Sequence, residues 1–294
     1  MKKIIRAIFF VFVIVPVAIF FAKCYFSKKD TTVPTRAIWW WTSVDCDVKY
    51  LEFLGINHIN EIYLGIGFLG DGNDEDKTEK VKNFIAAANE KGITVSALCG
   101  EWQWIQPDND GFDKAVALFN DYQNSATENQ KFYGLHLDIE PHQSENWDTN
   151  KDELMQLFCD FIVAKIAPLN IVIEMDIPFW LENFTVVCGG ESLPMNEVVF
   201  KYADTVVIMS YRDTAEKTLE ICTDEIALAK KYDKKIVLGQ ETFSTEGDQV
   251  SYYEEGFTVM NLEINILEQK LLKEFPNKKF GIAIHDMKRF YEMS

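Results

Sequence analysis

The sequence predicts an α/β protein in which a single (β/α)8 barrel, or TIM barrel, follows an N-terminal transmembrane or signal segment. Eight β-rich apolar runs alternate along the chain with amphipathic helical stretches, and no linker or internal repeat interrupts the series. Residues 30–294 match the roughly 250 residues typical of one such barrel. Strands that are each followed by a helix pair in parallel through right-handed crossovers. With eight of them, closure into a barrel is favoured over an open sheet.

The first element is an unbroken apolar run, AIFFVFVIVPVAIFFA at 7–22, with basic residues on both sides. It is slightly short of the roughly 20 residues that cross a bilayer, and snorkelling lysines can supply the difference. No clean A-x-A cleavage site follows it, and Lys23 stands where a lipoprotein signal needs a small residue before Cys24. Residues 1–29 are therefore expected to be an uncleaved signal anchor, with a cleaved signal peptide as the alternative. The barrel, residues 30–294, is expected outside the cytoplasm, or secreted if the segment is cleaved.

The charge of the chain is lopsided. Residues 1–29 hold six bases and no acids, so residues 30–294 carry 23 bases (29 − 6) against 46 acids, a net charge of −23. Such a surface disfavours nucleic acid or any other polyanion as partner. The six cysteines are scattered with no CxxC pair, which fits neither a disulfide scaffold nor a zinc site. No metal and no cofactor is expected, and the protein is expected to act as a monomer.

The barrel strands are assigned to eight runs, and clear helical patterns lie between several of them. The runs are 36–41, 59–67, 93–100, 132–140, 171–177, 205–211, 235–241 and 280–286. The clearest helical stretches are 76–92, 150–166, 214–235 and 261–275. Since active sites of this fold lie at the C-terminal ends of the strands, chemistry is expected where each run ends.

The fourth run, FYGLHLDIEP at 132–141, carries ionisable residues at alternate positions. In a strand, His136, Asp138 and Glu140 point to one face and the intervening apolar residues to the other. In a closed barrel that polar face is the interior, with Glu140 at the mouth and His136 deepest. An internal ion-pair network is one explanation, because buried carboxylates need partners. The other is a catalytic carboxylate pair, in which repulsion from Asp138 raises the pKa of Glu140.

Aromatic and polar residues gather at the other strand ends. All seven tryptophans fall at or just beyond such an end, and indole faces stack well on the C–H faces of sugars. Some of them are expected only to seal the barrel. The expected substrate-binding residues are Trp40, Trp102, Trp104, His136, Trp147, Asp176, Arg212 and His285. Acids and tryptophans in one cleft favour a carbohydrate substrate. Acyl transfer and phosphate chemistry are disfavoured, because the chain has no G-x-S-x-G elbow, no Cys placed with a His and no glycine-rich cradle.

With these motifs the chain resembles the glycoside hydrolase family 18 barrels, the chitinases and their relatives. The fourth strand of that family reads D-G-x-D-x-D-x-E; YGLHLDIE keeps Gly134, Asp138 and Glu140 but has Tyr133 and His136 at the first two Asp positions. The sixth strand of the family ends M-x-Y-D/N; MSYR, 209–212, keeps the Met and the Tyr. The family's eighth strand usually ends in a Trp that forms the floor for the sugar, whereas this chain offers a histidine, in GIAIHDM at 281–287.

The resemblance implies a retaining glycosidase that uses the 2-acetamido group of its own substrate as nucleophile. It implies that Glu140 protonates the departing oxygen, that Asp138 orients the acetamide and that Tyr211 hydrogen-bonds it. His136 is expected to bond Asp138 from below in place of the deeper Asp of the family. The departures at Arg212 and His285 weaken the expectation that N-acetylglucosamine is the substrate.

Other readings remain open. Glu140-Pro141 also resembles the large retaining clan whose acid/base lies in an N-E-P motif, although Ile139 replaces the Asn. In that scheme Glu241 is the nucleophile, with the two carboxyls about 5 Å apart; alternatively, Glu241 anchors the loop that follows it. A non-catalytic carbohydrate-binding barrel is a further alternative, and a scaffold for protein contacts is a weaker one.

Overall fold

A computed structural model describes residues 33–294 except 43–44, 71–74, 246 and 248. The expected signal anchor, residues 1–29, lies outside the described residues. Within the described part of the chain, no helix is long and apolar enough to cross a membrane.

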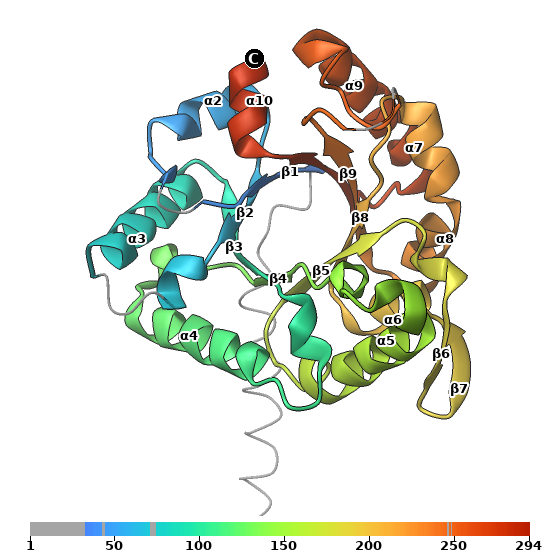
Figure 1. Ribbon diagram of the computed structural model, residues 1–294. Coiled ribbons are helices and arrows are strands. Elements are labelled where there is room, and N and C mark those ends of the chain that lie inside the picture. Colours follow the sequence, from blue (N-terminus) through green and yellow to red (C-terminus); the bar gives the residue numbers. More distant parts are fainter. Residues whose placement is uncertain (1–32, 43–44, 71–74, 246, 248) are drawn as a thin grey trace, which may run out of the picture. The chain divides into compact units, whose positions relative to one another are not determined.

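Eight parallel strands close into a barrel (Figure 1), in the order β1-β10-β9-β8-β5-β4-β3-β2. The closing pair is β1 with β10, in a register that sets Thr35 opposite Gly281. The strands are β1 Thr35–Trp40, β2 Glu61–Gly65, β3 Thr94–Cys99, β4 Leu135–Leu137, β5 Ile173–Pro178, β8 Thr205–Met209, β9 Lys235–Glu241 and β10 Phe280–His285. Each lies within, or within one residue of, one of the eight predicted runs, so the predicted barrel is confirmed.

Helices surround the barrel and connect its strands (Figure 1). They are α2 Tyr50–Ile56, α3 Glu75–Glu90, α4 Gly111–Ser125, α5 Trp147–Phe161, α6 Met195–Tyr202, α7 Ala215–Ile221, α8 Thr223–Tyr232, α9 Gly256–Glu274 and α10 Met287–Met293. A π-helical turn, Ile162–Ile166, extends α5. The predicted stretch 214–235 forms two helices rather than one, because Cys222 leaves helical geometry between α7 and α8.

One feature was not predicted. An antiparallel hairpin, β6 Thr185–Cys188 and β7 Glu191–Pro194, lies between β5 and α6. Its two-residue turn is Gly189-Gly190, and both glycines have positive φ, at 61° and 86°. Turns of this kind need such backbone angles, which glycine adopts without steric cost.

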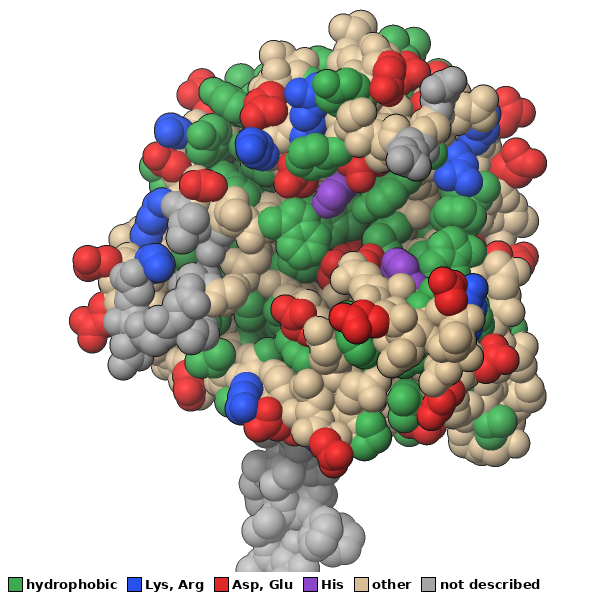
Figure 2. All heavy atoms as spheres, in the orientation of Figure 1, with side chains coloured by type: hydrophobic (Ala, Val, Ile, Leu, Met, Phe, Trp, Pro, Cys, Tyr) green, Lys and Arg blue, Asp and Glu red, His purple; other side chains and the backbone are tan. Residues whose placement is uncertain are grey.

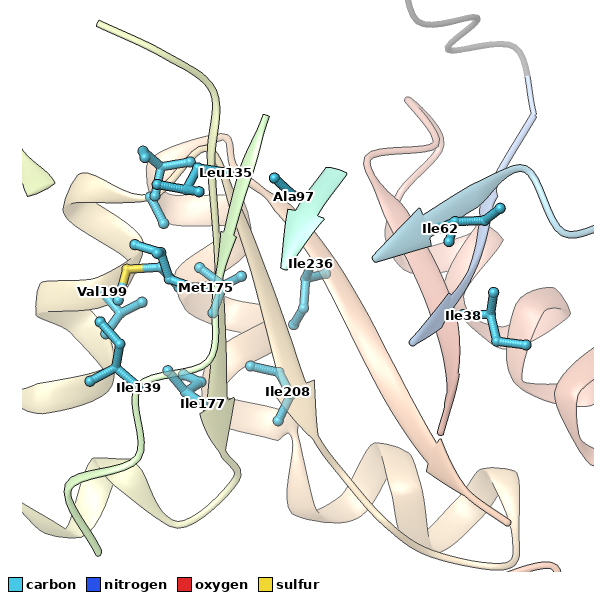
Figure 3. Packing of buried hydrophobic residues seen from close by; sticks show 14 of the residues in the cluster. Ile38, Ile62, Ala97, Leu135, Ile139, Met175, Ile177, Val199, Ile208 and Ile236 are labelled. Atoms are coloured by element: carbon cyan, nitrogen blue, oxygen red, sulfur yellow. The ribbon is translucent and has the colours of Figure 1, made fainter. Parts of the chain in front are cut away.

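The strands bury apolar side chains against the helices. Leu135, Met175 and Ile208 belong to the large core between barrel and helices, and Figure 3 shows this packing at close range. A smaller apolar cluster inside the barrel includes Trp39 and Tyr63. The alternation therefore follows the pleat of each strand.

The interior of the barrel is unusually polar. Branched apolar residues usually dominate such interiors, yet Glu61, His136, Glu174 and Asp176 here are at most 2 % exposed. Near the N-terminal end of the strands, Lys235 Nζ lies 2.8 Å from Glu61 Oε2. The carboxylates thus form a buried group beneath the mouth of the barrel.

Candidate active site

Strand β4 positions the central residues as its alternation predicts. His136 is fully buried inside the barrel, while Leu135 and Leu137 pack in the outer core. Beyond the strand the pattern continues, since Ile139 is also in the outer core. Asp138 and Glu140 therefore lie on the inner side, where the chain leaves β4 at the barrel mouth.

The glycine that follows the neighbouring strand β3 makes room for this exit. A Cβ atom at Gly100 would lie 1.7 Å from the backbone oxygen of Asp138. The Asp138 N–H still donates to the carbonyl of Cys99, at 3.0 Å. Only glycine allows this approach, so the position of Asp138 depends on Gly100.

His136 joins two carboxylates of β5. Its Nε2 lies 2.8 Å from Asp176 Oδ2 and its Nδ1 lies 3.4 Å from Glu174 Oε2, while the ring stacks on Tyr63 with centroids 3.8 Å apart. The predicted bond from His136 to Asp138 is wrong, because the carboxylates of the adjacent strand take both ring nitrogens.

This pairing fixes the charge of the imidazole. Burial lowers the pKa of His136, but Asp176 and Glu174 outweigh it and raise the pKa to about 10. A protonated ring donates from both nitrogens, which matches a carboxylate at each of them. Besides the two ring nitrogens of His136, Trp39 donates to these carboxylates, because its Nε1 lies 3.0 Å from Asp176 Oδ2. Asp176, predicted to bind substrate, is thus bonded within the barrel.

Asp138 lies above this group in a setting poor in donors. Its Oδ1 is buried and has no hydrogen-bond partner among the described residues. Burial raises the pKa of Asp138 well above its usual range, and the carboxylates of Asp176 and Glu140 raise it further. The carboxyl is therefore prone to hold a proton until a ligand brings a donor.

Glu140 sits at the mouth with its side chain 13 % exposed. Burial raises its pKa and the charge of Asp176 adds to this effect, whereas a hydrogen bond from Gln143 Nε2 opposes it. The predicted cause, repulsion from Asp138, is thus replaced by burial as the largest contribution. Sequence reasoning missed Gln143, and it also missed His142, whose Nε2 lies 3.7 Å from Glu140 Oε2.

Glu241, at the end of β9, differs from Glu140 in that the protein supplies hydrogen-bond donors to both of its oxygens. Its Oε1 accepts the backbone N–H groups of Thr242 and Phe243, at 2.7 and 2.8 Å. Its Oε2 lies 2.9 Å from His285 Nδ1. The side chain is 8 % exposed. Both oxygens are therefore engaged by the protein's own donors.

His285, at the end of β10, links Glu241 to a tryptophan that the sequence analysis did not select. The indole N–H of Trp41 donates to His285 Nε2, at 3.0 Å. Burial lowers the pKa of His285, but Glu241 raises it overall. The Trp41 bond requires an unprotonated Nε2, so the bonded ring is the neutral tautomer with hydrogen on Nδ1.

Tyr211 and Arg212 leave β8 beside this group. Tyr211 stacks on His285 with ring centroids 6.0 Å apart, and burial raises its pKa well above the usual range. The charges of Glu241, Asp176, Asp138 and Glu140 act in the same direction. Arg212 instead donates to the carbonyl of Tyr211, at 2.6 Å, and its guanidinium lies over the ring of Phe179.

The tryptophans divide into core and mouth residues. Trp40 is 4 % exposed and packs against Tyr50 and Phe84 in the outer core. Trp104 is 8 % exposed and packs on Phe112. Their predicted substrate contacts are therefore corrected, because both side chains are part of the core.

Two other predicted tryptophans keep some exposure. Trp102 is half-buried in the 3-10 turn Trp102–Ile105. Trp147 is half-buried in an aromatic cluster, with ring centroids 5.9 Å from Trp180 and 6.1 Å from His142. Trp102 follows β3 and Trp147 begins α5, the helix after β4, so both lie on the side of the mouth that carries Glu140.

The face of the molecule seen in Figure 2 is hollowed at its centre. Hydrophobic side chains line the hollow, with acidic and histidine side chains beside them. In the described part of the chain, no group of three or more His, Cys, Asp or Glu residues could hold a metal ion. Glu140, Asp138 and Tyr211 thus bring a carboxyl of raised pKa, a second carboxyl and a phenol to the C-terminal ends of β4 and β8.

Comparison with known proteins gives distant structural likeness only. No family model matches the chain, and no curated protein sequence matches it. An endo-β-N-acetylglucosaminidase from Cordyceps militaris is 15 % identical with a TM-score of 0.49, over 93 % of this chain and 87 % of that one. A chitinase from Chromobacterium violaceum is 12 % identical with a TM-score of 0.42, over 89 % and 98 %.

The likeness extends to a barrel of another activity. D-psicose 3-epimerase from Clostridium cellulolyticum is 14 % identical with a TM-score of 0.45, over 86 % of this chain and 84 % of that one. TIM barrels host many unrelated activities, which depend on the residues of the site rather than on the fold.

Proposed function

We propose that the protein is a glycoside hydrolase in which Glu140 is the general acid. One observation carries the proposal: Glu140 is a largely buried carboxyl with a raised pKa at the barrel mouth, next to a second carboxyl, Asp138. A general acid must hold its proton near neutral pH, and burial supplies the reason here. The face seen in Figure 2 is hollowed at its centre, which offers room for a sugar chain, and the Glu140 side chain keeps 13 % exposure.

The proposed reaction uses the substrate's own 2-acetamido group. Its carbonyl oxygen attacks the anomeric carbon while the glycosidic bond breaks and the Glu140 proton passes to the leaving oxygen. Water then attacks the anomeric carbon of the cyclic intermediate, the bond from that carbon to the acetamide oxygen breaks and restores the acetamide, and the water gives one proton to Glu140. Two displacements retain the configuration and restore the acid.

Asp138 and Tyr211 position the acetamide in this scheme. The charge of Glu140 raises the pKa of Asp138, so we treat the proton of this site as shared between the two carboxyls. The reactive arrangement has the proton on Glu140 and leaves Asp138 to accept the acetamide N–H. The buried, unpartnered Oδ1 of Asp138 supports this role. The Tyr211 hydroxyl, whose raised pKa keeps it protonated, donates to the acetamide oxygen.

The two-glutamate mechanism receives less support. A nucleophile needs an oxygen free to approach the anomeric carbon, whereas both oxygens of Glu241 accept hydrogen bonds from the protein. These contacts fit the alternative role of anchoring the loop after β9. A purely carbohydrate-binding barrel would have no need for a protonated Glu140. Such a protein would bind sugar without hydrolysing any glycoside.

The location of the enzyme is proposed from the sequence alone. Residues 1–29 anchor the chain in a membrane and the barrel acts outside the cytoplasm, as a monomer, on a surface or extracellular glycan. The support is the apolar run at 7–22 and its flanking lysines. Protease added to intact cells should degrade the barrel; complete protection until the cells are lysed would reverse the orientation.

Hydrolysis of aryl glycosides with and without a 2-acetamido group tests the proposal. The full chain in detergent is compared with its Glu140→Gln, Asp138→Asn and Glu241→Gln variants, and Glu145→Gln is the matched control because Glu145 is an exposed acid of the same loop. We expect activity only on 2-acetamido substrates, with the first two variants crippled and the last two active. Activity on plain glycosides that collapses in Glu241→Gln would establish the two-glutamate mechanism. No turnover with intact sugar binding would establish a binding protein.

A further inference from the structure

Two exposed aromatic side chains border the mouth on the side away from Glu140. Trp41 is 41 % exposed and Phe243 is 38 % exposed. The His285 ring lies between them, with centroids 6.2 Å from Trp41 and 5.9 Å from Phe243. Single exposed aromatics are common on protein surfaces. A pair arranged around one histidine at the hollow needs a more specific explanation.

The backbone of Trp41 is fixed by the end of the neighbouring strand. A Cβ atom at Gly65, the last residue of β2, would lie 2.1 Å from the carbonyl oxygen of Trp41. The backbone of Asp138 passes Gly100 in the same way, where a Cβ atom would collide with its carbonyl oxygen. Trp41 and Asp138 are thus both held where a glycine lets the chain pass close to the strand beside it.

The indole of Trp41 is fixed as well. Its N–H donates to His285 Nε2, His285 Nδ1 donates to Glu241, and Glu241 accepts two backbone N–H groups. The chain of bonds therefore begins at rigid backbone and ends at a half-exposed indole. A side chain already held in place loses little conformational entropy when a ligand binds.

The barrel order sets this group opposite the general acid. In the closed ring, β10 and β4 are four strands apart in either direction, so they face each other across the interior. Trp41 follows β1, which is the direct neighbour of β10. A sugar ring bound over the hollow would then lie between the Trp41 indole and the carboxyl of Glu140.

We propose that Trp41 is the stacking platform for the pyranose ring of the substrate, with His285 and Glu241 as positioning residues that hold the indole. The apolar C–H face of a pyranose packs on the indole, and its polar edge is left to Asp138 and Tyr211. The ligand class is a neutral pyranoside chain. This inference rests on the proposed function for its substrate, but it is tested through binding alone.

Calorimetric titration of the full chain with N-acetylglucosamine and glucose tetrasaccharides tests the platform. Glu140→Gln is the background, so that no hydrolysis occurs during the titration. We expect Trp41→Ala to weaken binding by about tenfold or more, and Trp41→Phe, which keeps a flat ring but loses the N–H, to fall between. Leu262→Ala is the control, because it removes a 58 % exposed apolar side chain from α9. Equal affinities for Trp41→Ala and Leu262→Ala would overturn the inference.

A double-mutant cycle tests the positioning role. If Glu241 acts by holding the indole through His285, Glu241→Gln weakens binding in the presence of Trp41 and has little further effect in Trp41→Ala. Additive losses of affinity would contradict the positioning role, because a merely structural effect of Glu241 does not depend on the indole.

The outcomes separate the two proposals. Binding that depends on Trp41 in a protein that hydrolyses no glycoside would remove the proposed function and keep the platform. Hydrolysis that is indifferent to Trp41→Ala would keep the function and remove the platform. If the chain binds neither tetrasaccharide, the platform is rejected.

Discussion

Glu140 follows β4 and Glu241 ends β9, strands that lie three apart in the closed ring, and the two residues differ in how many hydrogen-bond donors reach them. Glu140 follows β4, where burial raises its pKa and the described residues supply it with one close hydrogen bond, from Gln143. Glu241 ends β9, where two backbone N–H groups and His285 bond its oxygens. Burial with a single close donor leaves a carboxyl prone to hold its proton, whereas three donors fix the side chain of Glu241 in place. The first residue is therefore suited to give up a proton and the second to hold its neighbours in place.

The largest effect is expected for Glu140→Gln. Loss of a general acid lowers kcat by about 10²–10⁴-fold, while Gln preserves the shape of the side chain. Steady-state kinetics on a 2-acetamido aryl glycoside measure this. The same substitution at Glu145 should leave kcat nearly unchanged. A larger loss of kcat in Glu241→Gln than in Glu140→Gln would reverse the roles of the two glutamates.

The next effect concerns the backbone beside Asp138. Gly100→Ala puts a Cβ where the Asp138 carbonyl lies, so the carboxyl pair must shift. A displacement of about 1 Å can cost about 10² in rate. We expect a loss of that order, beyond any loss of folded protein seen by circular dichroism. Gly67→Ala is the matched control, since its Cβ would meet no atom within 4 Å. Equal activities of the two variants would show that this contact does not position the site.

A smaller effect is expected for Glu241→Gln. A residue that only positions the Trp41 indole affects sugar binding more than the chemical step, so KM should rise by roughly tenfold or less while kcat changes little. Michaelis curves for the variant and the wild type decide this. A fall in kcat of about 10³ or more, of the size expected when a catalytic group is lost, would give Glu241 a direct role in the chemistry.

The smallest effect is the pH dependence of folding stability that His136 contributes from beneath Glu140. The folded pKa of His136, about 10, lies above its usual value, so its contribution is complete below about pH 6.5 and disappears as pH rises through the folded pKa. Urea unfolding between pH 6 and pH 10.5 should show a decline that is steeper in the wild type than in His136→Gln. Identical slopes would mean that His136 is neutral in the folded protein.

The sequence predicted the secondary-structure elements but not the side-chain contacts between them. Eight strands and the inward face of the fourth followed from alternation, which each strand displays on its own. The partner of His136 did not, because Asp176 is on another strand and the stagger between strands is set by barrel closure. The prediction of which β1 residues face inward was also wrong. Trp40 faces the helices, and Trp41 is the tryptophan that lies at the barrel mouth.

Some of these errors had a signal in the sequence. Gly189-Gly190 marks the turn of the unpredicted hairpin. Gly65 ends β2 and Gly100 directly follows β3, and a missing side chain at such a position indicates close approach of another backbone. The donors around Glu241 had no such signal, since they are backbone N–H groups and a histidine 44 residues away in sequence.

The most direct test of the account follows the proton on Glu140. Rates of the wild type and Glu140→Gln are measured on a series of 2-acetamido aryl glycosides whose phenol leaving groups differ in acidity. If Glu140 protonates the leaving oxygen, the loss in Glu140→Gln is small for acidic phenols and grows steadily as the phenol becomes more basic. A loss of the same size across the whole series would contradict the assignment of Glu140 as general acid.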